Sequence, residues 1–458
     1  MKIIKIFLPI VVLLILTQGC GIYTKYERPE IPVADSLYNN IDSISVEDTI
    51  SIAKMSWREM FTDTKLQMLI EKGLNANTDL KLARLKVQET EAVLQASKLS
   101  YIPSVSLGAD GRVGSFDGKS SSPSYSVDLS ATWEVDIFGK LTNEKRQAFA
   151  SYEESRAYEQ AVMTQVVSAV ASSYYQLLML DRQLEISKST LDIWENTIIT
   201  LEALKGAGMA NETAVLQAKA NKVNLEEQVL TIQMHIQKVE NALSTLLYMP
   251  PQHISRTSLG EQSFPDNLSI GLPVELLSNR PDVRQAEFAL QKAFYGTNAS
   301  RSAFYPSLNL SGVLGWTNDT GVVVNPGGFL LNALGSLVAP LFNKGKNNAN
   351  LKIAKAKQEA AAIVFQQSLL DAGKEVNDAL IMYQTALKHQ VLTQERIEHL
   401  EEAVNKTKLL MKHSSVNYLE VLTAEQSLLA AQMQQAQNSF DEINGVICLY
   451  HSLGGGVE

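Results

Sequence analysis

Apolar and polar residues alternate along four segments of the chain. In the clearest one, every odd position is apolar or aromatic and every even position is Ser, Asp, Thr or Glu. The four segments are Val105–Val113, Tyr125–Ile137, Leu308–Trp316 and, less regularly, Phe329–Val338. Such alternation is typical of a β-strand with one apolar face. We therefore expect two β-hairpins, at residues 104–137 and 307–339.

Each predicted hairpin is followed by a long stretch in which apolar residues recur every seven positions. In the first stretch these residues are Met163, Val170, Leu177, Leu184, Leu191 and Ile198. This is the spacing of helices that pack along a coiled-coil seam. The segments KGAGMAN at 205–211 and HSSVNY at 413–418 interrupt the pattern as turns. We therefore expect two long helical hairpins, at residues 141–248 and 346–452.

The two halves of the chain repeat one order of elements. ASKLSYIPSVSL, which starts at Ala96, corresponds to ASRSAFYPSLNL, which starts at Ala299, and Phe-Gly-Lys at 138–140 corresponds to residues 342–346. Such an internal repeat predicts one structural plan used twice. The predicted organisation is a signal peptide at 1–19, a lipidated N-terminal segment at 20–62, a first repeat at 63–271 and a second repeat at 272–458.

The first twenty residues have the layout of an exported lipoprotein precursor. Lys2 and Lys5 precede an unbroken apolar run, and Gly19 precedes Cys20. Cleavage would make Cys20 the first residue, and acyl chains on it would anchor the protein, because each buried methylene adds ~0.8 kcal/mol of membrane affinity. Thr17 stands where such signals usually carry Leu. A plain secretory signal with an incidental cysteine is therefore the alternative.

After residue 20 the chain has no apolar run near the ~20 residues that a spanning helix needs. A strand of ~11 residues tilted near 45° matches the ~25 Å apolar band of outer-membrane barrels. Four strands cannot close a barrel, and lipid tolerates no open sheet edge, so several chains would have to complete one. The alternative is a soluble sheet whose Trp133 and Trp316 face is covered by the chain's own helices.

Charge and motif content exclude several classes of function. The net charge of −9 argues against a nucleic-acid partner. GSFDGKS, from Gly114, has one residue too few between its glycines for a phosphate-binding loop and lies between strands. The six histidines show no metal-ligand spacing, and the only cysteines are Cys20 and Cys448. We therefore expect no enzyme activity, no catalytic residue, no metal site, and no cofactor beyond the lipid on Cys20.

Three segments resemble the TolC-like outer-membrane efflux protein family, in particular its lipoprotein branch that serves RND-type pumps. They are CGIYTKYERP after the signal, WREMFTDTKLQMLIEKGLNANTDLKLA from Trp57, and LPVELLSNRPDVRQAE from Leu272. Arg280, Pro281 and Asp282 stand at the family's RPD signature, where proline followed by an acid also suits a plain helix start. The resemblance spans nearly the whole mature chain.

The resemblance implies an α+β membrane protein that assembles as a homotrimer. Its transmembrane β-barrel, with four strands from each chain, would continue as an α-helical coiled-coil barrel in the periplasm. The lipid-anchored channel would stand in the cell outer membrane and meet a periplasmic membrane-fusion adaptor and an RND inner-membrane transporter. It would passively conduct small molecules, such as drugs, toxic compounds or metal ions.

The resemblance also implies residues for a gate and for partner contacts. Glu420 stands at the first acidic gate position of the family, whereas the second position, usually Asp, is Thr423. Three copies of Glu420 around an axis would attract cations. The expected adaptor contacts are the helical tips, with Gly206, Gly208, Asn211, Ser414, Ser415 and Tyr418. The alternatives are an exposed helix glutamate and two plain helix turns.

Two other functions remain open from the sequence. A periplasmic lipoprotein scaffold would use the helical hairpins only to bridge partners. An exit duct for protein secretion would share the channel architecture but carry a different cargo.

Overall fold

The computed structural model describes residues 23–29, 55–113, 123–262, 280–317, 328–412 and 418–455. The chain divides into two compact units. Unit 1 comprises Met1–Ile31, Leu85–Ala157 and Arg284–Gln367, and unit 2 comprises Pro32–Arg84, Tyr158–Val283 and Ser368–Glu458. Each unit thus draws on both halves of the sequence. The predicted signal peptide, Cys20, Ser414 and Ser415 lie outside the described residues.

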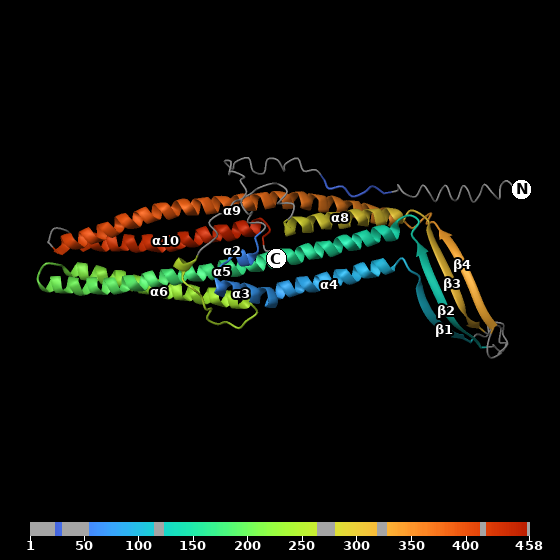
Figure 1. The fold of residues 1–458 in the computed structure, drawn as a ribbon, viewed down its shortest axis with the longest axis horizontal. Coiled ribbons are helices and arrows are strands. Elements are labelled where there is room, and N and C mark those ends of the chain that lie inside the picture. The colour runs from blue at the N-terminus through green and yellow to red at the C-terminus, as the bar shows by residue number, and fades with distance from the viewer. Residues whose placement is uncertain are drawn as a thin grey trace. The chain divides into compact units, whose positions relative to one another are not determined.

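The four predicted strands are confirmed, and they form one antiparallel sheet in unit 1. The strands β1 (Ser104–Arg112), β2 (Ser124–Val135), β3 (Ser307–Thr317) and β4 (Gly328–Val338) pair in chain order and lie side by side in Figure 1. The two halves of the chain meet where β2 pairs with β3, from Ser126–Thr317 to Val135–Leu308. Consequently β1 and β4 are the two edges of the sheet.

The register of the strands gathers the apolar positions on one face. One row across this face consists of Leu107, Leu129, Leu314 and Leu331. The opposite face is polar, and the hydroxyls of Ser106 and Ser130 lie 2.7 Å apart on it. Gly315 allows the close approach of β3 to β2, because a Cβ there would lie 2.3 Å from the Val127 carbonyl oxygen.

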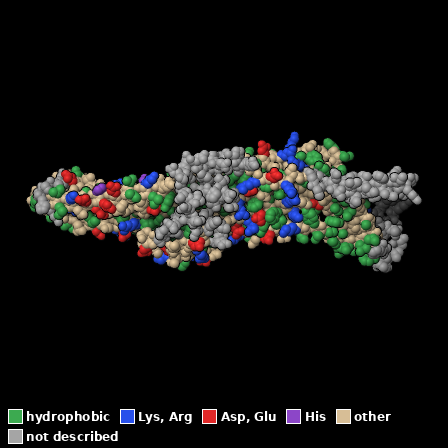
Figure 2. All heavy atoms as spheres, turned by 45° about the horizontal axis from the view of Figure 1, so that its top comes forward, with side chains coloured by type: hydrophobic (Ala, Val, Ile, Leu, Met, Phe, Trp, Pro, Cys, Tyr) green, Lys and Arg blue, Asp and Glu red, His purple; other side chains and the backbone are tan. Residues whose placement is uncertain are grey.

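The apolar face of the sheet is exposed. Trp133 is 38% exposed and Trp316 is 51% exposed. The helices of unit 1 meet the sheet at the ends of its strands (Figure 1), and Figure 2 shows mostly hydrophobic and uncharged surface over it. The described residues therefore contradict the soluble alternative, in which the chain's own helices would cover this face.

Long helices make up most of the remaining chain. The helices α5 (Lys140–Gly206) and α9 (Lys346–Lys412) have 67 residues each, and α6 (Glu212–Leu246) and α10 (Tyr418–Ser452) have 35 each. The shorter helices are α2 (Trp57–Met60), α3 (Thr64–Ala76), α4 (Thr78–Leu99), the 3-10 turn η4 (Leu259–Glu261) and α8 (Pro281–Ser302). The equal lengths of corresponding helices confirm the repeated plan. In the described ranges no helix is apolar enough over a sufficient length to cross a membrane.

The core of unit 2 follows the predicted heptad stripes. Val170 and Leu177 of α5 are fully buried, and Leu201 is buried near the end of that helix. One cluster joins α5, α6 and α10 and consists of Ile198, Leu201, Ala214, Val215, Ala218 and Leu422. The heptad residues thus serve packing, as expected from their spacing.

Candidate functional site

The first helical tip is a tight turn between α5 and α6. Gly206 ends α5, and Gly208 has φ +77°, a conformation that favours glycine. Asn211 caps α6, because its side-chain oxygen accepts the Ala214 N–H at 2.9 Å. A Cβ added at either glycine would meet nothing within 4 Å. The turn is therefore preformed and sterically open, and its contact with an adaptor stays a prediction.

The second tip holds the predicted gate residues at the start of α10. Tyr418 packs against the cluster that joins α5, α6 and α10. Glu420 is exposed in the first turn of α10, where its negative charge interacts favourably with the helix dipole. Thr423 is exposed and donates its hydroxyl to the Leu419 carbonyl at 2.8 Å. This position suits a gate ring and an ordinary surface glutamate equally, so the gate stays a prediction.

A buried glutamate that the sequence reasoning missed lies further along α10. Glu425 is 5% exposed, and among the described residues neither of its carboxylate oxygens accepts a hydrogen bond. The Lys408 ammonium of α9 lies 2.8 Å from Oε1, so the charge is balanced by an ion pair without hydrogen-bond geometry. The pair borders a cavity of about 240 Å³. The signal in the sequence was a carboxylate spaced between Val421 and Leu429 on the buried stripe.

The signature residues Arg280, Pro281 and Asp282 start α8 in unit 2. Arg280 is 3% exposed, and its guanidinium donates to both Asp282 carboxylate oxygens, at 3.0 and 2.7 Å. It also donates to Glu375 of α9 at 2.6 Å and to the Ser452 carbonyl of α10 at 2.8 Å. Burial raises the pKa of the Asp282 carboxyl, but the hydrogen bonds and charge of Arg280 outweigh burial and hold that pKa below its ordinary value. Arg280 therefore ties three helices together, which exceeds the role of a plain helix start.

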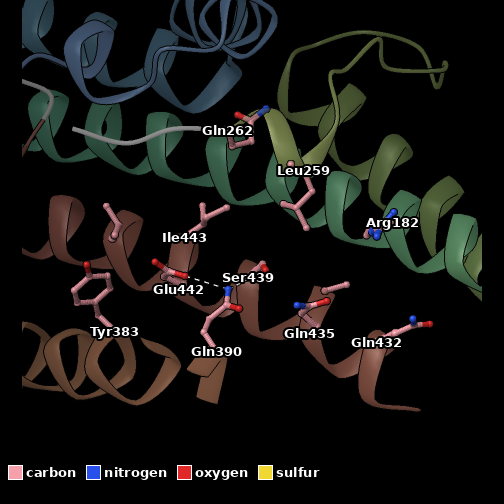
Figure 3. A pocket seen from close by; sticks show the side chains of 13 residues that line it. Arg182, Leu259, Gln262, Tyr383, Gln390, Gln432, Gln435, Ser439, Glu442 and Ile443 are labelled. Atoms are coloured by element: carbon pink, nitrogen blue, oxygen red, sulfur yellow. Dashed lines mark hydrogen bonds between the residues drawn. The ribbon is translucent and has the colours of Figure 1, made fainter. Parts of the chain in front are cut away.

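A polar cavity of about 610 Å³ lies between α5, α9 and α10 beside η4. Gln390 of α9 donates to Ser439 at 2.9 Å and to Glu442 at 3.1 Å, and these side chains point toward one another in Figure 3. The polar groups that line the cavity are mainly amides and hydroxyls, which can form hydrogen bonds with water. Across the described part of the chain, no group of three or more His, Cys, Asp or Glu residues could hold a metal ion.

Residues 23–29 belong to unit 1 and contact its helices. Tyr23 donates its hydroxyl to the Phe138 carbonyl at 2.7 Å, close to the junction between β2 and α5. The Tyr26 ring packs edge-on against Phe294 at 5.6 Å, and Arg28 lies over the Phe365 ring. Tyr23 is therefore held beside the end of β2, and the residues after it run along α8 and α9.

Comparison with known proteins supports the same architecture. The outer membrane efflux protein family matches residues 69–247 and 272–455, one match in each half. The cation efflux system protein CusC of Escherichia coli is 32% identical over 98% of both chains. The probable outer membrane lipoprotein SilC of Salmonella typhimurium is 29% identical over 96% of both chains.

A solved structure has the same fold. The open state of the MtrE outer membrane channel of Neisseria gonorrhoeae superposes with a TM-score of 0.86 and is 27% identical. The superposition covers 96% of this chain and 99% of that one. Four strands and long paired helices thus occur in a known channel, and both halves of the chain fit the family. The chain belongs to the outer membrane efflux protein family, whose members are channels of efflux pumps in the outer membrane and not enzymes.

Proposed function

We propose that three copies of this chain close one transmembrane β-barrel and form the outer-membrane duct of a tripartite efflux pump. The observation that carries the proposal is the sheet of unit 1, which has one exposed apolar face and two edge strands. Lipid can cover such a face, but open backbone edges in lipid are too costly to persist. Three copies would supply twelve strands, enough for a closed barrel.

The internal repeat predicts how one copy would pair with the next. The pairing of β1 with β2 ends at Ser104 and Thr132, and the pairing of β3 with β4 ends at Ser307 and Val338. Ser104 therefore corresponds to Ser307, and Thr132 corresponds to Val338. Pairing of β4 with β1 of the next copy should therefore follow the pairing of β2 with β3. Since Ala131 lies opposite Gly312, Leu337 should lie opposite Ala109 of the next copy.

Cysteine cross-linking tests this register. In a Cys448→Ser background, the double variant Leu337→Cys with Ala109→Cys should form intermolecular disulfides and give a covalent trimer. The matched control is Leu331→Cys with Ala109→Cys, which uses the same strands and the same face but places the thiols about 20 Å out of register. Equal cross-linking of both variants, or a protein that stays monomeric, would overturn the proposal.

Glu420 is proposed to narrow the periplasmic end of the duct. Three like charges near an axis attract cations and resist close approach, and Glu420 is exposed at the helical tip. Glu420→Ala should raise the single-channel conductance and lower cation preference, whereas Thr423→Ala, three residues away, should change neither. Unchanged conductance and selectivity in Glu420→Ala would remove it as a gate residue.

A lipid on Cys20 is proposed to anchor the N-terminus, with the helices in the periplasm. SilC is described as a probable lipoprotein. Tyr23 is held beside the strand ends, and three residues can span at most ~11 Å, so the acyl chains would start close to the membrane surface. The mass of the purified protein should exceed that of the chain from Cys20 by three acyl chains and the glycerol. The Cys20→Ser variant should lack this increment, and an unmodified wild-type mass would refute the anchor.

The partners are proposed to be a periplasmic adaptor, which would contact both helical tips, and an RND transporter. Support comes from the open turn at Gly206 and Gly208 and from relatives named for cation and solvent efflux. The cargo is accordingly proposed to be small molecules or metal ions. A deletion strain should become sensitive to metal salts, to solvents or to drugs, and that pattern identifies the cargo. Loss of protein secretion without any sensitivity would favour the secretion duct instead.

A further inference from the structure

Two apolar side chains project fully into solvent just after the last strand. Leu341 is 98% exposed and Phe342 is 86% exposed, and they are the most exposed large hydrophobic residues among those described. Single exposed hydrophobic residues are ordinary on protein surfaces, but adjacent ones beside an apolar edge mark a contact surface. Leu337 and Val338 of β4, also exposed, continue the same surface.

The first half of the chain shows what normally occupies this place. Gly139 and Gly345 have matching φ angles of +68° and +76°, and each directly precedes the first residue of its 67-residue helix. Counting back three residues from each glycine aligns Asp136 with Phe342, so the Phe-Gly pairing read from the sequence is shifted by two residues. Asp136 accepts the backbone N–H groups of Leu141 at 2.9 Å and Thr142 at 2.8 Å.

Phe342 therefore stands where the first half has a helix cap. A phenyl ring has no hydrogen-bond acceptor, so the second helix forgoes this stabilising contact. The backbone also differs, because Lys344 has φ +46°, an unfavourable conformation for a residue with a Cβ. The second junction thus has the exposed ring of Phe342 in place of a capping aspartate, and it has a strained backbone at Lys344. We infer that these features serve a contact with another molecule.

The position of that contact follows from the sheet. Val135 lies opposite Leu308 where β2 pairs with β3. Leu341 corresponds to Val135 in the repeat, and Val105 corresponds to Leu308. The same pairing between copies therefore places Leu341 opposite Val105 of the next copy. Val105 and Ile102, three residues before it, are exposed in the single chain. Two exposed apolar pairs from opposite edges of the sheet would thus meet.

We propose that Leu341 and Phe342 pack against Val105 and Ile102 of a second copy of this chain and lock the seam between protomers. Within one chain, the corresponding seam is closed by Phe138, whose ring stacks on Tyr305 at 5.2 Å. Lys344 and Ile102 hold the equivalent places, and they cannot stack. Phe342, two residues before Lys344, would supply an aromatic ring at the seam between copies in place of Phe138. This inference rests on the trimer proposed above and adds to it the residues that hold its seam.

Trimer stability gives the first test. In Phe342→Ala the folded monomer should keep its helices, but the monomer fraction at a fixed detergent concentration should rise roughly tenfold or more, because a buried ring is lost at each seam. Leu331→Ala is the matched control, since Leu331 is an exposed apolar residue of β4 far from this contact. Its monomer fraction should change little.

Cross-linking gives the second test. Leu341→Cys with Val105→Cys, which the register places opposite each other, should form disulfides between copies, whereas Leu341→Cys with Ala109→Cys should not. A stable trimer that neither cross-links here nor weakens in Phe342→Ala would overturn the lock and leave the channel intact. In such a trimer, a Phe342→Trp variant that also carries Trp133→Phe and Trp316→Phe gives the second readout, and quenching of its added fluorescence by brominated lipid would assign the ring to the membrane instead. If the wild-type protein is monomeric, the proposed trimeric channel is itself contradicted.

Discussion

The buried arginine of unit 2 and the sheet of unit 1 differ in where their side chains find partners. In unit 2, Arg280 is buried and donates to groups on three helices, and the side chain of Arg256, which is 7% exposed, pairs with Asp181 and Glu240. In unit 1, the sheet exposes an apolar face and two strand edges. These two arginines of unit 2 therefore find their partners within one chain. The sheet of unit 1 lacks such partners within the chain, and we propose that lipid and further copies supply them.

The largest effect should come from a charge on the apolar face of the sheet. Leu129→Arg places a guanidinium in the middle of β2 and should cost about 2–4 kcal/mol in each protomer of a lipid-embedded barrel. Ser130→Arg is the matched control, because Ser130 is adjacent but lies on the polar face. Trimer recovery from membranes measures both. Equal losses would mean that the two faces do not differ in their surroundings.

Breaking the polar contacts of unit 2 should act on folding instead of assembly. Arg280→Ala should lower the free energy of unfolding by about 3 kcal/mol, at the low end for a broken buried pair, because Asp282 and Glu375 can still reach water. Arg182→Ala removes an exposed pair with Glu185 and should change stability by less than about 0.5 kcal/mol. Thermal unfolding followed by circular dichroism compares the two variants. A small effect of Arg280→Ala would show that the helices hold together without it.

Glu425 is an exception within unit 2, because its carboxylate oxygens are buried without hydrogen bonds. Replacing a buried charge that lacks hydrogen bonds by an apolar residue often stabilises the folded protein. Glu425→Leu should therefore raise the free energy of unfolding by about 1–2 kcal/mol. Lys408→Ala, which leaves the carboxylate without its cation, should lower it. If Glu425→Leu is also destabilising, the ion pair contributes more than packing can replace.

The smallest effect concerns the two strand–helix junctions. Asp136→Ala should cost about 1 kcal/mol because α5 loses its cap. Phe342→Asp should offer α9 a cap of the same kind while weakening the trimer. Hydrogen exchange of the first-turn amides in α5 and α9 measures the caps. Faster exchange after both substitutions would show that the two junctions are not equivalent.

The sequence predicted the elements well because their signals are local. Period-two alternation identified the strands, and β4 begins at Gly328, next to the predicted Phe329. Heptad spacing and the glycines near Gly208 located the first long hairpin, and α6 begins at Glu212 as expected. Local periodicity depends only on neighbouring residues, so no tertiary information was needed.

The parts that escaped prediction depend on distant segments. Arg280 was interpreted as a helix start, but its partners Glu375 and Ser452 lie far along the chain. The burial of Glu425 depends on α9 packing against α10. The alignment of Phe342 with Asp136 became visible only through the φ angles of the two glycines. Each of these features requires knowledge of which helices and strands meet.

Assembly and conduction can be measured on one preparation of the wild-type protein. Wild-type protein extracted from outer membranes in mild detergent should have the mass of three chains, dissociate on heating, and conduct ions in a planar bilayer before heating but not after. A monomer that stays in solution without detergent and never conducts would mean that other copies in lipid do not complete the sheet.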